Sequence, residues 1–90
     1  MLDNLEQLIR IIRDRKDSSS GDSYTKKLLT DKKLSVAKVK EEVAELIESV
    51  DQNSNKIHEA ADVIYHLMVY LEGNNIKIED VMSELKKRQK

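Results

Sequence analysis

The 90-residue chain has no cysteine and no proline, and it has only two glycines. Without cysteine, neither a disulfide framework nor a thiolate metal centre can form, which excludes zinc fingers, iron–sulfur clusters and cysteine nucleophiles. With so few helix breakers and an abundance of Leu, Ile, Glu and Lys, the composition favours helices over strands. We therefore expect an all-α protein.

Long apolar runs are missing as well. No stretch approaches the roughly 20 apolar residues that span a bilayer, and residues 1–17 lack the uninterrupted apolar segment of a signal peptide. The charges nearly balance, with 16 Lys and Arg against 17 Asp and Glu, so the basic excess typical of nucleic-acid binders is missing. We expect a cytoplasmic protein that binds neither membranes nor nucleic acids.

The spacing of apolar residues predicts helices separated by polar loops. Because residues 1–90 make a single short domain with a modest core, we expect an antiparallel bundle of about four to five helices. Chains of this size often gain stability by oligomerising. The predicted elements are a helix from Leu2 to about Lys16, a loop at 17–22, a short helix capped by Ser23 and anchored by Leu28 and Leu29, a connector at 30–33, a long helix from Ser35 to Val50, a loop at 51–55, a helix from Lys56 to Leu71 with Gly73 as its cap, and a last helix from Glu79.

The long helix carries an acidic patch. On a helical wheel Glu41, Glu42 and Glu45 lie together, in the pattern E-E-x-x-E, with Glu42 on the flank nearer the apolar residues that should face the core. Like charges at i,i+4 are mildly destabilising, and Lys38 alone lies close enough to offset them. A solvated face and a functional site remain equally open for this pattern taken alone.

The helix that follows is apolar around most of its circumference, so it should be central in the fold or lie in an interface. Its narrow polar stripe holds Glu59, Asp62 and His66 at i, i+3 and i+7. Carboxylates on a mostly buried helix are costly unless they are paired or bind metal. Tyr65 points away from this stripe, and we expect it to pack.

A short loop joins these two helices, which should therefore lie antiparallel with their carboxylates converging. Oxygen ligands suit a hard cation, Mg²⁺ or Mn²⁺. Zinc is not expected, because the nitrogen donors His58 and His66 fall on different faces. A metal beside a cationic rim suits polyphosphate binding, although each lysine alone can equally be a surface charge. The basic residues that precede or flank the acidic cluster are Arg13, Arg15, Lys16, Lys26, Lys27, Lys32, Lys33, Lys38 and Lys40.

Several segments together resemble the phosphoribosyl-ATP pyrophosphohydrolase family of histidine biosynthesis, and through it the all-α NTP pyrophosphatases similar to MazG. The acidic motifs mark the larger group, whereas S-Y-T-K-K-L-L at 23–29 and E-A-A-D-V-I-Y-H at 59–66 are more specific to the histidine enzyme. The resemblance extends from Leu5 to Arg88. Lys40 and Val43 depart from the family, which usually has Gly and Ala there, but they leave the carboxylates intact.

The resemblance implies Mg²⁺-dependent hydrolysis of phosphoribosyl-ATP to phosphoribosyl-AMP and pyrophosphate. It also implies a homodimer whose bundle is built from helices of both chains. The expected metal ligands are Glu42, Glu45, Glu59 and Asp62, the expected catalytic residues are Glu41 and Glu42, and the expected substrate contacts are Ser23, Tyr24, Lys27, Lys38, His66 and Arg88. We expect Glu41 to act as a further ligand or as the general base.

Structural roles remain open for some of these residues. Lys38 can pair with Glu42 at i,i+4, Tyr24 can pack at the edge of the core, His66 can be a satisfied core residue, and Arg88 can belong to a solvated tail.

Two other functions remain as alternatives. A house-cleaning pyrophosphatase that acts on dUTP, dCTP or modified nucleotides would use the same carboxylates. A non-enzymatic helical module would bind partners through its apolar helix and leave the acidic patches as ordinary surface. The second alternative does not explain why two acidic patches occur on consecutive helices that should face each other.

Overall fold

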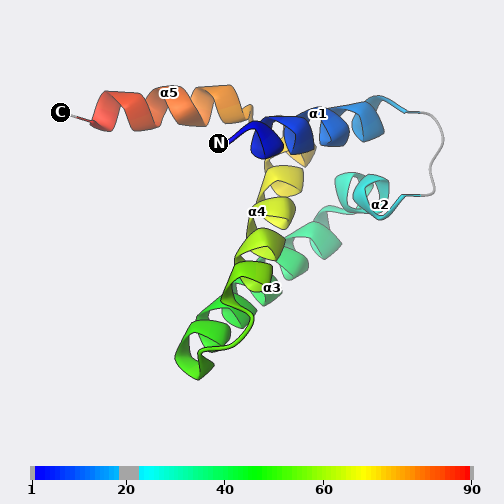
Figure 1. Cartoon of the computed structure of the whole chain (residues 1–90). Coiled ribbons are helices and arrows are strands. Elements are labelled where there is room, and N and C mark those ends of the chain that lie inside the picture. The colour runs from blue at the N-terminus through cyan, green and yellow to red at the C-terminus, as the bar shows by residue number, and fades with distance from the viewer. Residues whose placement is uncertain (1, 19–22, 90) are drawn as a thin grey trace.

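The computed structural model describes residues 2–18 and 23–89. These residues form five helices and no strand, so the expected all-α class is confirmed (Figure 1). Part of the predicted 17–22 loop, residues 19–22, lies outside the described residues. The helices are α1 (Asp3–Asp17), α2 (Tyr24–Thr30), α3 (Lys32–Gln52), α4 (Lys56–Gly73) and α5 (Ile78–Arg88).

The helices α3 and α4 form an antiparallel hairpin, as the short loop between them predicts (Figure 1). The chain reverses at Asn53 and Asn55, whose backbones adopt the left-handed helical conformation with φ angles of 53° and 50°. The short polar side chain of Asn tolerates this conformation better than most residues. The N–H of Ser54 donates to the carbonyl of Ser49 at 2.9 Å, which satisfies a carbonyl at the end of α3.

The position of α4 is central, as its broad apolar surface predicts, because it contacts all four other helices. Figure 1 shows α1 crossing one end of α4, with α5 leading away from the same end. The buried apolar core lies where α1, α2 and α4 meet, and it confirms the two leucine anchors expected for α2. Its members are Ile9, Ile12, Leu28, Leu29, Met68 and Val69.

The short helix α2 begins as predicted, because the hydroxyl of Ser23 accepts the N–H of Lys26 at 3.0 Å. The prediction of a connector at 30–33 is wrong in part, since α3 begins at Lys32. There Asp31 is the cap, and its carboxylate accepts the N–H of Leu34 at 3.1 Å. An N-terminal cap of this kind satisfies a backbone donor that the helix itself leaves unpaired.

The prediction that Gly73 caps α4 is also wrong. Gly73 is the last helical residue, and Asn75 adopts the left-handed conformation instead, with φ of 58°. The N–H of Ile76 then donates to the carbonyl of Leu71 at 2.9 Å. An asparagine therefore makes the turn for which glycine is the commoner choice.

The buried face of α3 is polar rather than apolar, against our expectation. Ser35, Glu42 and Ser49 are its buried residues, and they recur every seven positions on one face of the helix. Val43, Ile47 and Val50, which the sequence pattern places toward the core, remain 39–59% exposed. The flank of α3 that carries Glu42 therefore packs toward α4, and the part of the apolar arc formed by Val43, Ile47 and Val50 faces outward.

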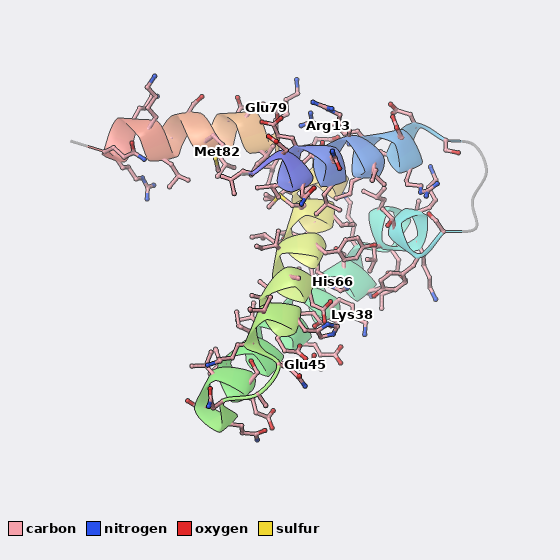
Figure 2. The ribbon with its side chains drawn as sticks, viewed as in Figure 1. Arg13, Lys38, Glu45, His66, Glu79 and Met82 are labelled. Atoms are coloured by element: carbon pink, nitrogen blue, oxygen red, sulfur yellow. The ribbon has the colours of Figure 1, made fainter. Side chains whose placement is uncertain are left out.

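An ion-pair cluster joins α1 to the α4–α5 junction. The Nε of Arg13 donates to the carboxylate of Glu72 at 2.5 Å, and its two terminal nitrogens donate to Glu79 at 2.9 and 2.6 Å (Figure 2). The Nζ of Lys16 donates to the carbonyl of Glu72 at 2.7 Å and to the side chain of Asn75 at 2.8 Å. Arg13 and Lys16, expected on a phosphate-binding rim, are therefore engaged in holding the fold together.

None of the helices in the described part of the chain combines the length and apolar character needed to cross a membrane.

Candidate active site

Carboxylates from the two helices of the α3–α4 hairpin converge at one place. Oxygen atoms of Glu42, Glu45 and Glu59 all lie within 4.8 Å of one another. Glu42 and Glu45 come from α3, and Glu59 comes from the first turn of α4. The antiparallel packing of two consecutive helices therefore brings together three of the four residues expected to bind metal.

Two oxygen atoms in this cluster have no partner. Glu42 is buried, with 7% of its surface exposed, and among the described residues its Oε2 and the Oε2 of Glu59 are buried without a hydrogen bond. An unsatisfied buried acceptor is costly, and more so when it carries charge. A bound cation would satisfy both atoms, so this donor set fits a hard metal ion such as Mg²⁺.

The electrostatics of the cluster oppose ionisation. Burial raises the pKa of Glu42 above its ordinary value, and the charges of Glu45 and Asp62 raise it further while His66 opposes them. Burial likewise raises the pKa of Glu59, with the charge of Glu45 as the next cause. Both shifts have the direction expected for carboxylates gathered in a partly desolvated site.

The fourth expected ligand, Asp62, lies at the edge of this cluster. Its Oδ2 is 3.4 Å from the Nε2 of His58, and oxygen or nitrogen atoms of His58, Glu59 and Asp62 also lie within 4.8 Å of one another. Glu59 belongs to both groups and so connects them. His58 was not expected among the ligands, although its i,i+4 spacing from Asp62 is a signal in the sequence that could have placed it here.

Glu41 and Lys38 lie beside the cluster as a pair. The Nζ of Lys38 is 3.1 Å from a carboxylate oxygen of Glu41 at i,i+3, so Glu41 rather than Glu42 is its partner. The side chain of Glu41 is half exposed, and it belongs to neither group of converging donors. Figure 2 shows Lys38 and Glu45 of α3 near His66 of α4, far from Arg13.

A set of aromatic side chains borders the carboxylates. The Nδ1 of His66 lies 2.8 Å from the backbone carbonyl of Asp62, and its Nε2 lies 3.2 Å from the hydroxyl of Tyr24. Because a carbonyl can only accept, Nδ1 carries the proton, and in the neutral ring Nε2 accepts from Tyr24. His66 is buried, and both of its ring nitrogens have hydrogen-bond partners, so it is a satisfied core residue that lies beside the site.

The hydroxyl of Tyr24 interacts electrostatically with the charged residues of the site. Burial raises its pKa, Lys38 lowers it, and the charges of Glu42 and Glu41 raise it. Tyr24 as a whole residue is still 45% exposed. Tyr24 therefore extends from α2 toward the site while keeping a surface that a ligand can reach.

Tyr65 packs, as expected, but it packs toward the site. Its ring stacks on Tyr24 with centroids 6.4 Å apart and meets His66 edge-on at 4.9 Å. Its hydroxyl lies 2.5 Å from the Oγ1 of Thr25. Neither Thr25 nor this contact was predicted, because helical spacing on α4 does not indicate which residue of α2 lies opposite.

The remaining expected substrate contacts are less closely tied to the cluster. The hydroxyl of Ser23 caps α2, and Lys27 is exposed on α2. Arg88 is the last residue of α5, and Figure 1 shows this end of α5 remote from the α3–α4 hairpin. The Nζ of Lys26, another residue of the expected basic rim, donates to the carbonyl of Lys16 at 3.0 Å.

The fold and the site together define an all-α protein with a cluster of carboxylates whose chemistry fits a hard cation, built on a helix hairpin and bordered by a lysine, a histidine and tyrosines. Comparison with known proteins narrows this class. The family model for phosphoribosyl-ATP pyrophosphohydrolase matches residues 5–89, and the chain belongs to that family.

Individual relatives agree with the family match. The chain is 39% identical to a phosphoribosyl-ATP pyrophosphatase of Haloarcula marismortui, over 97% of this chain and 94% of that protein. It is 41% identical to a phosphoribosyl-ATP pyrophosphatase of Clostridium novyi, over 99% of this chain and 84% of that protein. A bifunctional histidine-biosynthesis protein of Arabidopsis thaliana, described as chloroplastic, is 40% identical over 97% of this chain but only 34% of its own length.

Proposed function

We propose that this protein hydrolyses phosphoribosyl-ATP to phosphoribosyl-AMP and pyrophosphate, with Mg²⁺ held by the carboxylates of the α3–α4 hairpin. The family membership supports the reaction. The observation that supports the site is the convergence of Glu42, Glu45 and Glu59 with two buried oxygen atoms left unpartnered. The non-enzymatic alternative offers no reason for such a costly arrangement.

Glu42, Glu45 and Glu59 would hold the metal, with Asp62 joining them through Glu59. A bound Mg²⁺ supplies positive charge to phosphate oxygens and makes hydrolytic water easier to deprotonate. Mn²⁺ has similar ligand preferences and is an alternative ion. For Asp62 to bind metal, its contact with His58 at 3.4 Å must be exchanged for one with the ion.

Of the two glutamates expected in catalysis, Glu42 is the better placed to accept a proton from water. It lies inside the cluster, beside the position proposed for the metal and its water. Glu41 lies outside, where its contact with Lys38 orients that ammonium group. We propose that Glu41 positions Lys38 rather than taking the proton itself.

The substrate carries a triphosphate chain and an aromatic purine base, and both match groups at the site. Lys38 is proposed to contact a phosphate, and Tyr24 of α2 is proposed to contact the substrate, with His66 of α4 buried behind it as the partner of the Tyr24 hydroxyl. Lys27 and Ser23 are proposed to line the approach of the substrate. Hydrolysis breaks the anhydride bond between the α- and β-phosphates, with the oxygen and protons of one water shared between the two products. Removing water from this region would strengthen each of these charged contacts.

The test is pyrophosphate release from phosphoribosyl-ATP, with dUTP, dCTP and ATP measured alongside, each in Mg²⁺ and in EDTA. We expect Mg²⁺-dependent release from phosphoribosyl-ATP alone, and loss of turnover in Asp62→Ala with the helical circular dichroism spectrum retained. Turnover confined to the deoxynucleotides would instead support the alternative function of a house-cleaning pyrophosphatase. Full activity of the Asp62→Ala variant would show that Asp62 is not part of the active site.

We also propose that the protein is a homodimer. Apolar side chains on the outer face of the hairpin remain exposed, among them Ile47 at 59% and Ile57 at 88%. Burying apolar area stabilises association by about 25 cal/mol per Å², and several large apolar side chains left exposed on the same two helices favour an interface there. Since the same two helices carry the carboxylates, association would also stabilise the site. In a dimer, Arg88 would bind the substrate held by the other protomer.

Analytical ultracentrifugation tests the dimer directly. Ile57→Glu together with Ile47→Glu should shift the protein from dimer to monomer and lower activity. Met82→Glu on α5, exposed at 47%, is the matched control for an added charge elsewhere and should remain dimeric. A wild-type monomer at micromolar concentration would contradict this part of the proposal.

A further inference from the structure

We infer that Thr25 and Tyr65 are positioning residues, whose hydrogen bond sets the rotation of α2 against α4 and thereby holds Tyr24 at His66. The inference deepens the proposed function and rests on it, because it assigns Tyr24 and His66 to the substrate side of that site. Neither Thr25 nor Tyr65 belongs to the converging carboxylates. Their effect on the reaction would therefore pass through Tyr24.

The helix α2 needs such an external constraint. It has only seven residues, well below the roughly 12–15 at which an isolated helix becomes stable in water. Its position is therefore decided by what it touches. Leu28 and Leu29 fix its C-terminal half in the core, but they lie a full turn away from Tyr24.

In the N-terminal half of α2, next to the contact of Tyr24 with His66, Thr25 contacts Tyr65 of α4. Their hydroxyl oxygens lie 2.5 Å apart, and the pair is partly buried, where a hydrogen bond is stronger than in water. Ser23 is occupied in capping the helix and does not reach α4 through that hydroxyl. The Thr25–Tyr65 bond therefore resists rotation of α2 about the leucine anchors.

The same two elements carry the pair that faces the substrate. Tyr24 precedes Thr25, and His66 follows Tyr65, so the two hydrogen bonds run side by side between α2 and α4. The ring of Tyr65 adds a stacking contact to Tyr24, with 19° between the ring planes. A rotation of α2 that breaks one bond would also lengthen the other.

The position of Tyr24 matters because its hydroxyl interacts electrostatically with Lys38 and Glu42, the residues proposed to contact phosphate and metal. Loss of one oriented hydrogen bond typically weakens binding about tenfold. Because the carboxylates stay in place, the chemical step should change little. The signature of a positioning role is therefore a raised KM with a nearly constant kcat.

The experiment compares Thr25→Val, Tyr65→Phe and the conservative control Thr25→Ser. Valine keeps the shape of threonine, and phenylalanine keeps the ring that stacks on Tyr24. We expect KM for phosphoribosyl-ATP to rise roughly tenfold in the first two variants, with kcat within about twofold. Thr25→Ser should behave as wild type. The Thr25→Val, Tyr65→Phe double variant should be no worse than either single variant, because both remove the same bond.

A second readout does not need turnover. In protein labelled with ¹⁵N-histidine, the Nε2 resonance of His66 reports whether Tyr24 donates to it, with Tyr24→Phe giving the position without that bond. His58→Gln identifies the other histidine. Thr25→Val should move the His66 resonance toward the Tyr24→Phe position, and Thr25→Ser should not.

The outcomes separate this inference from the proposed function. If wild type fails to turn over phosphoribosyl-ATP, the proposed function is lost, and the His66 resonance still tests the positioning of Tyr24. If Thr25→Val and Tyr65→Phe leave both the resonance and KM unchanged, the inference is overturned. It is equally overturned if activity falls only in parallel with loss of helical content, because the hydrogen bond would then serve stability alone.

Discussion

Replacing Glu42 with Gln should stabilise the metal-free protein while abolishing its activity. Glu42 is buried, and its Oε2 has no hydrogen-bond partner. Gln has nearly the same volume, so the change leaves no cavity. It removes one negative charge from the cluster and supplies an amide that can donate to a neighbouring carboxylate.

The magnitude follows from the spacing of the carboxylates. Two unit charges 4.8 Å apart, the upper limit within the cluster, repel by about 3.5 kcal/mol at an effective dielectric constant of about 20. The raised pKa of Glu42 already relieves part of this repulsion, and counterions screen more of it. We therefore expect a stabilisation of about 1–2 kcal/mol, which raises Tm by roughly 5–15 °C in a domain of this size.

The assay is thermal unfolding in EDTA and again in excess Mg²⁺, at one fixed chain concentration because association would also stabilise the fold. In EDTA the Glu42→Gln variant should melt above wild type. In Mg²⁺ wild type should gain about 2.7 kcal/mol at a hundredfold excess over Kd, and the variant should gain little. The order of the two melting temperatures should therefore reverse.

Glu41→Gln is the matched control, since it makes the same chemical change one residue earlier on α3. Glu41 is half exposed and paired with Lys38, so its loss should change stability by less than about 1 kcal/mol and leave the response to Mg²⁺ intact. A Glu42→Gln variant that is less stable than wild type in EDTA would refute the reasoning. So would a variant that responds to Mg²⁺ as fully as wild type does.

Three further predictions concern the framework around the site. Arg13→Met should cost about 2–3 kcal/mol in urea unfolding, because it leaves the buried carboxylate of Glu72 unpaired; an equal cost for Glu79→Gln, which removes only the exposed partner, would contradict this. Arg13 lowers the pKa of Glu79 from its ordinary value of 4.5 to about 2. The stability that this ion pair contributes should therefore be complete above about pH 4.5 and be lost as the pH falls from there to about 2. In an acid titration of Arg13→Met, this pH-dependent loss of stability should be absent. Ser23→Ala should cost about 1 kcal/mol by removing the cap of α2, which Ser23→Asp should restore; no change in unfolding free energy for Ser23→Ala would show that the cap contributes nothing.

Much of the candidate site could be predicted because its chemistry is local in sequence. Glu42 and Glu45 share one flank of a helix by their spacing, and Glu59 follows after a loop too short to allow anything but a hairpin. Convergence of these carboxylates is then a consequence of helix geometry. The same reasoning placed Asp62 and His66 on one stripe of α4, where the structure finds them close to the cluster or in contact with Tyr24.

The errors arose where long-range contacts decided the outcome. Arg13 and Lys16 have the charge of a phosphate-binding rim, but Glu72 and Asn75, more than fifty residues away, engage them. The apolar arc of α3 has the periodicity of a core face, and yet Val43, Ile47 and Val50 remain exposed, consistent with the proposed association. Composition and periodicity describe a residue's own helix and cannot identify its partner on another.

The sequence by itself determined the helical class, the order of the helices, the acidic motifs and the family, because each depends on residue type and on spacing along the chain. Only the tertiary structure decided that Glu42 is buried while Glu41 is not, and that Lys38 pairs with Glu41. It also showed that Thr25 and Tyr65 join α2 to α4. The physical reason is that a helix can rotate about its axis without changing its local hydrogen bonds, so packing against other helices selects which face becomes the site.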